Sequence, residues 1–210
     1  MEHKTSNELY KYWDAVRNNR RAPHRFEIEP SKIANILSQT FILERRQHDI
    51  YRFRLAGTQI CSNFGKELRG KNILDLWLGP DWTTVHALLD IVTEDAAVGV
   101  VRFRAMTQED REAEFEMIFL PLIHTEPSIN RVLGSISPIE TPFWLGTVPL
   151  IRFEVLDARD IWANGLLSAD TNSDPAFPDT SDAQDHRVVE VDQRRFRIYD
   201  GGLSGPSKIS

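Results

Sequence analysis

Apolar residues near the N-terminus recur at the spacing of an α-helix, at Leu9, Tyr10, Trp13 and Val16. Thr5 and Glu8 have the spacing of a capping box, which predicts that the helix begins beside them. Asparagines and Pro23 in "RNNRRAPHR" predict its end. A second helix is predicted from Pro30, because proline favours the first helical position, with a buried side formed by Ile33, Ile36 and Leu37.

The pattern then changes from helical to alternating. "TFILERR" (residues 40–46) and "DIYRFRLAG" (residues 49–57) predict the two strands of a β-hairpin. In the second strand, alternation predicts an apolar face of Tyr51, Phe53 and Leu55 and a basic face of Arg52 and Arg54. Residues 58–76 predict irregular backbone with short helical turns.

A helix with a clear apolar stripe is predicted from Asp81 to about Glu94. Asp81 follows Pro80 and is a favourable N-cap residue. The stripe consists of Trp82, Val85, His86, Leu89 and Val92.

Two strands are predicted next, at residues 98–106 and 112–122, and their sequences indicate how they pair. If Met106 pairs with Glu112, then Arg104 faces Glu114, Arg102 faces Glu116 and Phe103 faces Phe115. A slip of one residue would place each arginine opposite an apolar residue, so we expect this register. A third strand, residues 130–140, completes an antiparallel meander.

The pattern divides the chain into five parts. They are an N-terminal helical segment (1–39), a core (40–144), an extended arm (145–163), a flexible linker (164–186) and a C-terminal tail (187–210). The arm could equally be one more strand. The linker is rich in aspartate, proline and small residues and contains no Lys or Arg, so it has little apolar area to bury.

Composition excludes several classes of protein. The chain has 210 residues, a formal net charge of −6 and one cysteine, so it offers no intramolecular disulfide and no general attraction to nucleic acid or anionic membranes. It has no secretory signal and no apolar run long enough to span a bilayer, which predicts a cytoplasmic protein. Gly57, Gly65 and Lys66 do not have the spacing of a phosphate-binding P-loop.

Four segments together resemble a PAS domain. They are two strands ending in "LAGT", the stretch "FGKELRGKNILDLW", a helix, and three antiparallel strands. The segment "YWDAVRNNRRAPHR" before them and "YDGG" (Tyr199–Gly202) near the end are similar to those of standalone PAS-domain proteins of alphaproteobacteria. The resemblance implies an α+β fold with a five-stranded antiparallel sheet, helices on one face, and a sensory or regulatory role without enzyme activity.

The resemblance leaves the ligand open. Flavin-binding photosensory PAS domains carry a cysteine in "NCRFLQ", whereas Cys61 lies in "QICSNF", so a flavin adduct is not expected. The main hypothesis is a module that acts through a signalling protein partner, with or without a small ligand in its core cavity. One alternative is a haem sensor with His86 as the axial ligand, and another is a small α+β enzyme that uses the same cavity.

Candidate site residues follow from these hypotheses. The cavity candidates are Leu55, Ile60, Phe64, Trp77, Trp82, His86, Leu89, Phe103 and Phe115. The stripe of Leu9, Tyr10, Trp13 and Val16 must be buried, either on the chain's own sheet or against a second copy. The resemblance to PAS domains favours the second copy, so we predict a homodimer with Trp13 at its centre. No catalytic residue and no metal site is assigned, since the five histidines other than His86 show no metal-ligand spacing. The sequence identifies no cofactor.

Overall fold

The computed structural model describes residues 1–125 and 128–161 of the chain. The linker and tail predicted at 164–210, including "YDGG", lie outside these residues. The helices are α1 (Lys4–Arg17), α2 (Thr58–Phe64) and α3 (Pro80–Glu94), and the strands are β1 (Thr40–Gln47), β2 (Ile50–Ala56), β3 (Val98–Met106), β4 (Glu112–Thr125), β5 (Ser128–Pro138) and β6 (Arg152–Ile161). Short 3-10 helices lie at Arg25–Glu27, Pro30–Ile33, Leu37–Gln39 and Ile73–Leu76.

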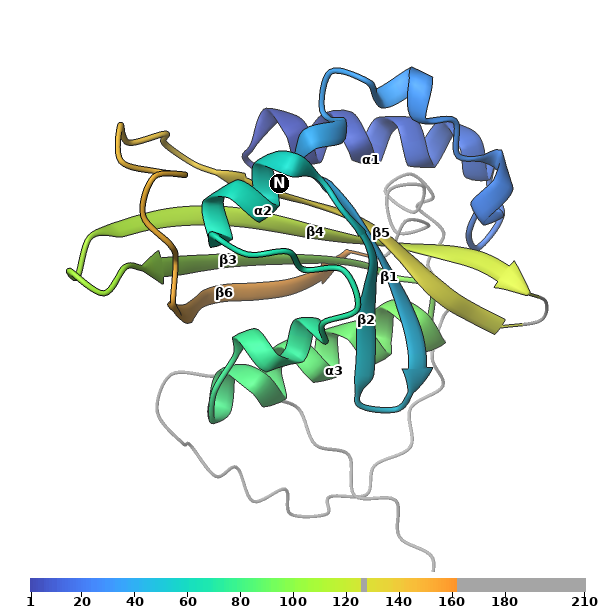
Figure 1. Cartoon of the computed structure of the whole chain (residues 1–210). Helices are drawn as coiled ribbons and strands as arrows, with labels where there is room; N and C mark the ends of the chain where they lie inside the picture. Colours follow the sequence, from blue (N-terminus) through green and yellow to red (C-terminus); the bar gives the residue numbers. More distant parts are fainter. Residues whose placement is uncertain (126–127, 162–210) are drawn as a thin grey trace, which may run out of the picture. The chain divides into compact units, whose positions relative to one another are not determined.

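The strands form a single antiparallel sheet in the order β2-β1-β5-β4-β3-β6 (Figure 1). The predicted register between β3 and β4 is confirmed, with Arg104 opposite Glu114 and Phe103 opposite Phe115. The α+β class and the antiparallel sheet are therefore as expected. The strand count is not, because the described part of the chain contributes six strands rather than five.

The sixth strand comes from the segment predicted as an extended arm. β6 pairs antiparallel with β3 along its whole length, from Val98 opposite Ile161 to Met106 opposite Arg152. Phe153 of this strand is buried in the main core beside Phe64, with ring centroids 5.1 Å apart. Burial of one apolar side chain and a full ladder of backbone hydrogen bonds explain why this segment is a strand.

Helices cover both faces of the sheet, whereas the sequence predicted helices on one face. Figure 1 shows α1 and α3 on opposite sides of the sheet. On the inner face, α2, α3 and the 3-10 helix at Ile73–Leu76 enclose the main core. On the outer face, α1 and the following 3-10 helices pack on a second apolar cluster that includes Ile118, Leu120 and Leu133.

The two N-terminal helix predictions differ from the structure in detail. The N-cap of α1 is His3, whose Nδ1 accepts a hydrogen bond from the Thr5 amide, so Thr5 lies inside the helix. Instead of capping, the Thr5 hydroxyl donates to Oε1 of Gln39. The helix predicted from Pro30 is two short 3-10 helices, in which Ile33 and Ile36 are buried but Leu37 is exposed.

Candidate functional site

The predicted cavity residues lie mostly together, but they form a packed core. Ile60, Phe64, Trp77, Leu89, Phe103 and Phe115 are all buried. The rings of Phe103 and Phe115 stack with centroids 5.2 Å apart, and Trp77 meets Phe103 edge-on at 5.3 Å. These rings contact one another within the main core. Within the described residues, Trp77 Nε1 has no hydrogen-bond partner.

Leu55 is not part of this core, so its assignment to the cavity is wrong. Phe53 pairs with Leu43 and Leu55 pairs with Ile42, which leaves Arg54 as an extra residue in β2. This β-bulge shifts the alternation by one position. Leu55 therefore leaves the face of Tyr51 and Phe53 and is 41% exposed.

Trp82 and His86 lie at the margin of the core and contact each other. Their rings stack with centroids 4.8 Å apart and an angle of 10° between planes. His86 Nε2 is 3.0 Å from the backbone oxygen of His48, at the turn of the β1–β2 hairpin. The imidazole therefore lies under this turn, held by a local hydrogen bond. That position does not favour the haem hypothesis.

The residues assigned to a dimer interface are largely used within the chain itself. Leu9 and Trp13 are fully buried against the outer face of the sheet, and Tyr10 and Val16 are half-buried beside them. Trp13 Nε1 donates a hydrogen bond of 2.8 Å to the backbone oxygen of Pro121 in β4. The prediction that Trp13 lies at the centre of a dimer is therefore wrong.

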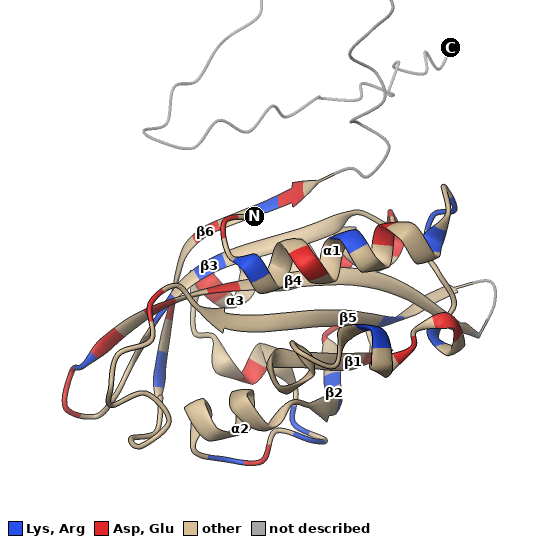
Figure 2. Ribbon diagram, turned by 90° about the horizontal axis from the view of Figure 1, so that it is seen from above, with Lys and Arg blue, Asp and Glu red and all other residues tan. Residues whose placement is uncertain are grey.

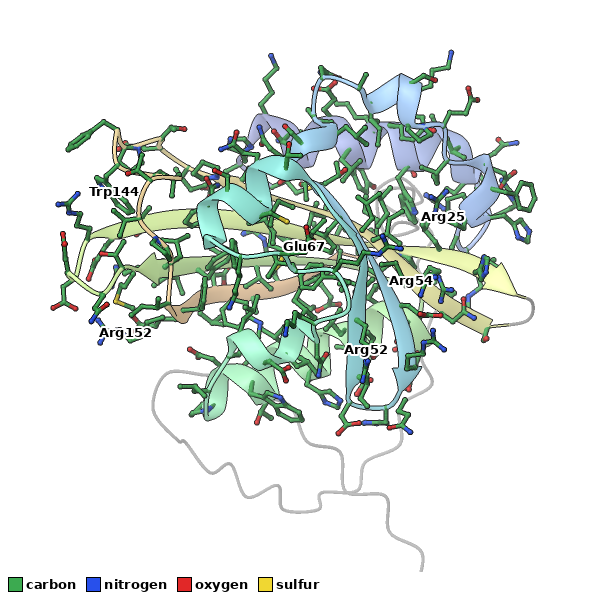
Figure 3. All side chains as sticks on the ribbon, viewed as in Figure 1. Arg25, Arg52, Arg54, Glu67, Trp144 and Arg152 are labelled. Carbon is green, nitrogen blue, oxygen red and sulfur yellow. The ribbon has the colours of Figure 1, made fainter. Side chains whose placement is uncertain are left out.

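A basic hollow lies on the β1–β2 hairpin, and sequence reasoning did not identify it as a site. Its volume is about 650 Å³. Glu44, Arg46, Gln47, Ile50, Arg52, Phe53, Arg54, Arg69 and Gly70 line it. Figure 2 shows the basic positions along β1 and β2, and Figure 3 labels Arg52 and Arg54 on the hairpin. We refer to this feature as the basic hollow.

Local structure explains how the arginines reach the basic hollow. Alternation along β2 turns Arg52 away from the core, and the bulge turns Arg54 in the same general direction. The loop that carries Arg69 follows the edge of β2, where the Gly70 amide donates to the Phe53 oxygen and the Phe53 amide donates to the Lys71 oxygen. Gly70 has a φ of +82°, a conformation that glycine adopts without strain.

One carboxylate holds three arginines at the base of the basic hollow. Glu44 Oε1 lies 2.8 Å from Arg131, while Oε2 lies 2.8 Å from Arg46 and 3.6 Å from Arg54. The Glu44 and Arg131 side chains are only 10% and 11% exposed. Burial lowers the pKa of the Arg131 guanidinium, and repulsion from Arg54 and Arg46 acts in the same direction against the attraction of Glu44.

The charge of the basic hollow is not neutralised by its surroundings. Its lining contains four arginines and a single glutamate, a formal excess of three positive charges on a chain whose net charge is −6. In residues 1–125 and 128–161, the side chains of Arg52 and Arg69 have no ion pair or hydrogen bond. These two guanidinium groups are therefore available to an anionic partner.

A second hollow, of about 480 Å³, lies beside the β3–β4 pair and has one arginine and three glutamates in its lining. It is formed by Arg104, Glu112, Ala113, Glu114, Ile139, Glu140, Thr141 and Pro142. Arg104 is paired with Glu112 at 3.2 Å and with Glu114 at 3.7 Å. The lining therefore keeps a formal excess of two negative charges, the opposite sign to that of the basic hollow.

The described residues form an α+β domain with an antiparallel sheet, an apolar core on each face of the sheet, and a basic hollow on the β1–β2 hairpin. The chain belongs to the PAS-domain family, since the model of that family matches residues 1–137. No curated protein matches the chain. No helix among the described residues is long and apolar enough to cross a membrane.

Two solved structures are similar to the chain in part. One is the light-state structure of the blue-light photoreceptor Aureochrome1 LOV, with 14% identity, a TM-score of 0.40, and coverage of 50% of this chain and 83% of that chain. The other is a light-oxygen-voltage domain from work with a flavin analogue, with 14% identity, a TM-score of 0.41, and coverage of 52% and 85%.

Proposed function

We propose that this PAS domain is a cytoplasmic regulatory module that acts by binding a signalling protein, and that an acidic segment of the partner occupies the basic hollow. The observation that carries the proposal is the excess of arginine over glutamate in that hollow, with Arg52 and Arg69 unpaired among the described residues. A regulatory role without catalysis agrees with the family to which the chain belongs.

Charge and shape favour a short acidic segment over an extended polyanion. The chain as a whole is acidic, so a long nucleic acid would meet repulsion beyond the hollow. A short segment feels mainly the local charges, because screening limits their range to about 8 Å at physiological salt. Ile50, which is partly exposed, also lines the hollow and offers contact to an apolar side chain within such a segment.

The packed interior supports a mechanism based on surface contact. Phe103, Phe115, Trp77 and Phe153 make stacked and edge-on contacts with one another in the main core. An aromatic cluster of this kind resists the entry of a flat cofactor, because side chains would have to leave their rotamers. We therefore place the main recognition event on the hairpin.

The test compares two charge-reversal variants of the full chain that have equal net charge. Arg52→Glu with Arg69→Glu changes the basic hollow, whereas Lys11→Glu with Lys32→Glu changes two exposed lysines elsewhere. Binding of a fluorescein-labelled oligoglutamate peptide is followed by anisotropy. We expect at least about tenfold weaker binding for the hollow variant and little change for the lysine variant.

Three outcomes would contradict the proposal. Equal losses in both variants would mean that only net charge matters. Displacement of the peptide by inorganic phosphate at a similar concentration would indicate a small-anion site instead of a protein site. A Soret band in the purified full chain would favour the haem hypothesis. Proteins recovered from host extract by the wild type and the lysine variant, but not by the hollow variant, would then identify the partner.

Homodimerisation stays part of the proposal, without Trp13 at its centre. Sedimentation of the full chain at micromolar concentration measures it directly. A monomer would contradict this part alone and leave the basic hollow unaffected.

A further inference from the structure

Two histidines and an aspartate from distant parts of the chain meet beside the β1–β2 hairpin. His48 lies in the turn between the strands, and His86 and Asp90 lie on α3, four residues apart and therefore on one helix face. Figure 1 shows the tip of the hairpin beside α3. One ligand atom from each residue lies within 4.8 Å of the other two.

The distances fit a metal ion with few changes. Asp90 Oδ2 is 3.5 Å from His48 Nε2 and 3.5 Å from His86 Nδ1. Ligand atoms in a tetrahedral zinc site are about 3.3 Å apart, given bond lengths of about 2.0–2.2 Å. His48 is 70% exposed, so its side chain can rotate to close the remaining separation.

The second ring nitrogen of His86 determines which atom faces Asp90. The backbone oxygen of His48 can only accept a hydrogen bond, so Nε2 carries a hydrogen and donates to it across 3.0 Å. In the neutral ring, Nδ1 then has a lone pair directed at the Asp90 carboxylate. The lone pairs of His86 Nδ1 and Asp90 Oδ2, 3.5 Å apart, favour a cation between these two atoms. The hydrogen bond from Nε2 to a backbone oxygen is also typical of histidines that bind a metal through their other ring nitrogen.

Hydrogen bonds also fix the orientation of the Asp90 carboxylate, through the oxygen that does not face the histidines. Oδ1 accepts hydrogen bonds from the Tyr51 hydroxyl at 2.9 Å and from Arg45 at 3.1 Å, which leaves Oδ2 toward the histidines. An ionised carboxylate oxygen can only accept, so the Tyr51 hydroxyl is the donor of this hydrogen bond.

Nearby charges permit a cation at this position. The positive charge of Arg45 is shared between Asp90 and Glu94, to which it donates a hydrogen bond of 2.9 Å. One arginine is therefore matched by two carboxylates, so the local balance is negative before any metal binds. Two imidazoles and one carboxylate are the ligand set that zinc and other late first-row divalent metals prefer.

We propose that His48, His86 and Asp90 form a binding site for a divalent transition metal ion, with zinc as the best match, and that water completes its coordination. The site joins the hairpin turn to α3, so an ion there ties together two segments that are otherwise linked by side-chain contacts. The proposal does not depend on the basic hollow.

The test uses the untagged full chain, freed of metal by a chelator and then titrated with zinc in a calorimeter. We expect one equivalent to bind the wild type and His48→Ala to weaken binding at least about tenfold. His124→Ala is the matched control, because His124 is also exposed but lies on β4 outside the cluster. Its affinity should equal that of the wild type.

Cobalt and copper provide independent measurements. Cobalt should give visible absorption bands typical of a site with nitrogen and oxygen ligands, and these bands should disappear in His48→Ala. Copper should quench the fluorescence of Trp82, whose ring stacks on His86, and Trp82→Phe should remove that part of the quenching. No zinc equivalent bound by the wild type, or equal binding by His48→Ala, would overturn the proposal.

Discussion

Two regions of the sheet combine arginine with glutamate, and they do so in opposite proportions. In the β3–β4 region, Arg104 has carboxylates from Glu112, Glu114 and Glu154 within 3.2–3.7 Å. In the hairpin region, Glu44 is shared by Arg46, Arg54 and Arg131. In the β3–β4 region an arginine is paired with several carboxylates, whereas in the hairpin region several arginines are paired with a single carboxylate.

The difference indicates separate roles for the same residue types. Cross-strand pairs in the β3–β4 region specify the register, and Arg102 and Arg104 are both paired with carboxylates there. The hairpin region retains an excess of positive charge that contributes little to pairing of the strands. An excess maintained by a buried glutamate suggests recognition of an anionic partner, and the following substitutions test that interpretation.

The largest effect is expected for Glu44→Gln. The substitution removes the carboxylate beneath three arginines and leaves Arg131 largely buried without a counter-charge. We expect a loss of about 3 kcal/mol in the free energy of unfolding, measured by urea denaturation. Glu114→Gln, at a carboxylate that is 39% exposed, should cost below about 1 kcal/mol. Equal losses of unfolding free energy in Glu44→Gln and Glu114→Gln would show that the two regions do not differ in how much their carboxylates stabilise the fold.

An intermediate, pH-dependent effect is expected for Glu116, which faces Arg102 across the β3–β4 pair. Burial opposes its ionisation, but the amides of Glu2 and His3, at 2.7 and 3.0 Å, and the hydroxyl of Ser6 outweigh burial and lower its pKa. Because its folded pKa lies below the unfolded one, its contribution is present above about pH 4.5 and is lost as the pH falls through the folded pKa.

Glu116→Gln should therefore destabilise the fold by about 1–2 kcal/mol at neutral pH and by progressively less in acid. Urea unfolding of the wild type and the variant across this pH range measures the difference. If the difference in the free energy of unfolding between wild type and variant does not decrease in acid, the charge of Glu116 does not contribute to stability, and the prediction is wrong.

The smallest effect on stability separates Arg52 from Arg104. Arg52→Ala should change the free energy of unfolding by less than about 0.5 kcal/mol, since among the described residues its side chain has no ion pair. Arg104→Ala should cost about 1 kcal/mol through lost cross-strand pairs. Binding of the oligoglutamate peptide should show the reverse order, with a loss only for Arg52→Ala. Thermal denaturation and anisotropy measure the two quantities.

Local pattern was sufficient where a strand has two distinct faces. The β3–β4 register could be predicted because a slip would mismatch charged and apolar residues together. The same alternation failed at Leu55, since a bulge at Arg54 adds a residue without a sequence signal that distinguishes it. The arm at 145–163 could not be decided for a related reason, because β6 is an edge strand in which charged and apolar residues are mixed.

The spacing of apolar residues also predicted which side chains are buried, but not which part of the molecule they pack against. The stripe of Leu9 and Trp13 was predicted correctly as apolar, but it packs on the chain's own sheet. His48 and His86 are 38 residues apart, so no local motif predicts their contact. The arginines of the basic hollow were visible as outward positions of one hairpin, whereas Arg69 and the buried Glu44 required the tertiary structure.

The N-terminal segment shares its core with the sheet, and this affects how the domain can be divided into fragments. Besides the Trp13 contact, the Ile123 amide of β4 donates a hydrogen bond of 3.0 Å to the Pro23 oxygen. A fragment that begins at Thr40 would therefore expose the apolar residues of the outer face, which include Ile42, Ile118, Leu120, Leu122 and Leu133. An uncovered apolar sheet surface promotes aggregation, so residues before Thr40 are a condition of solubility for the PAS domain of this chain.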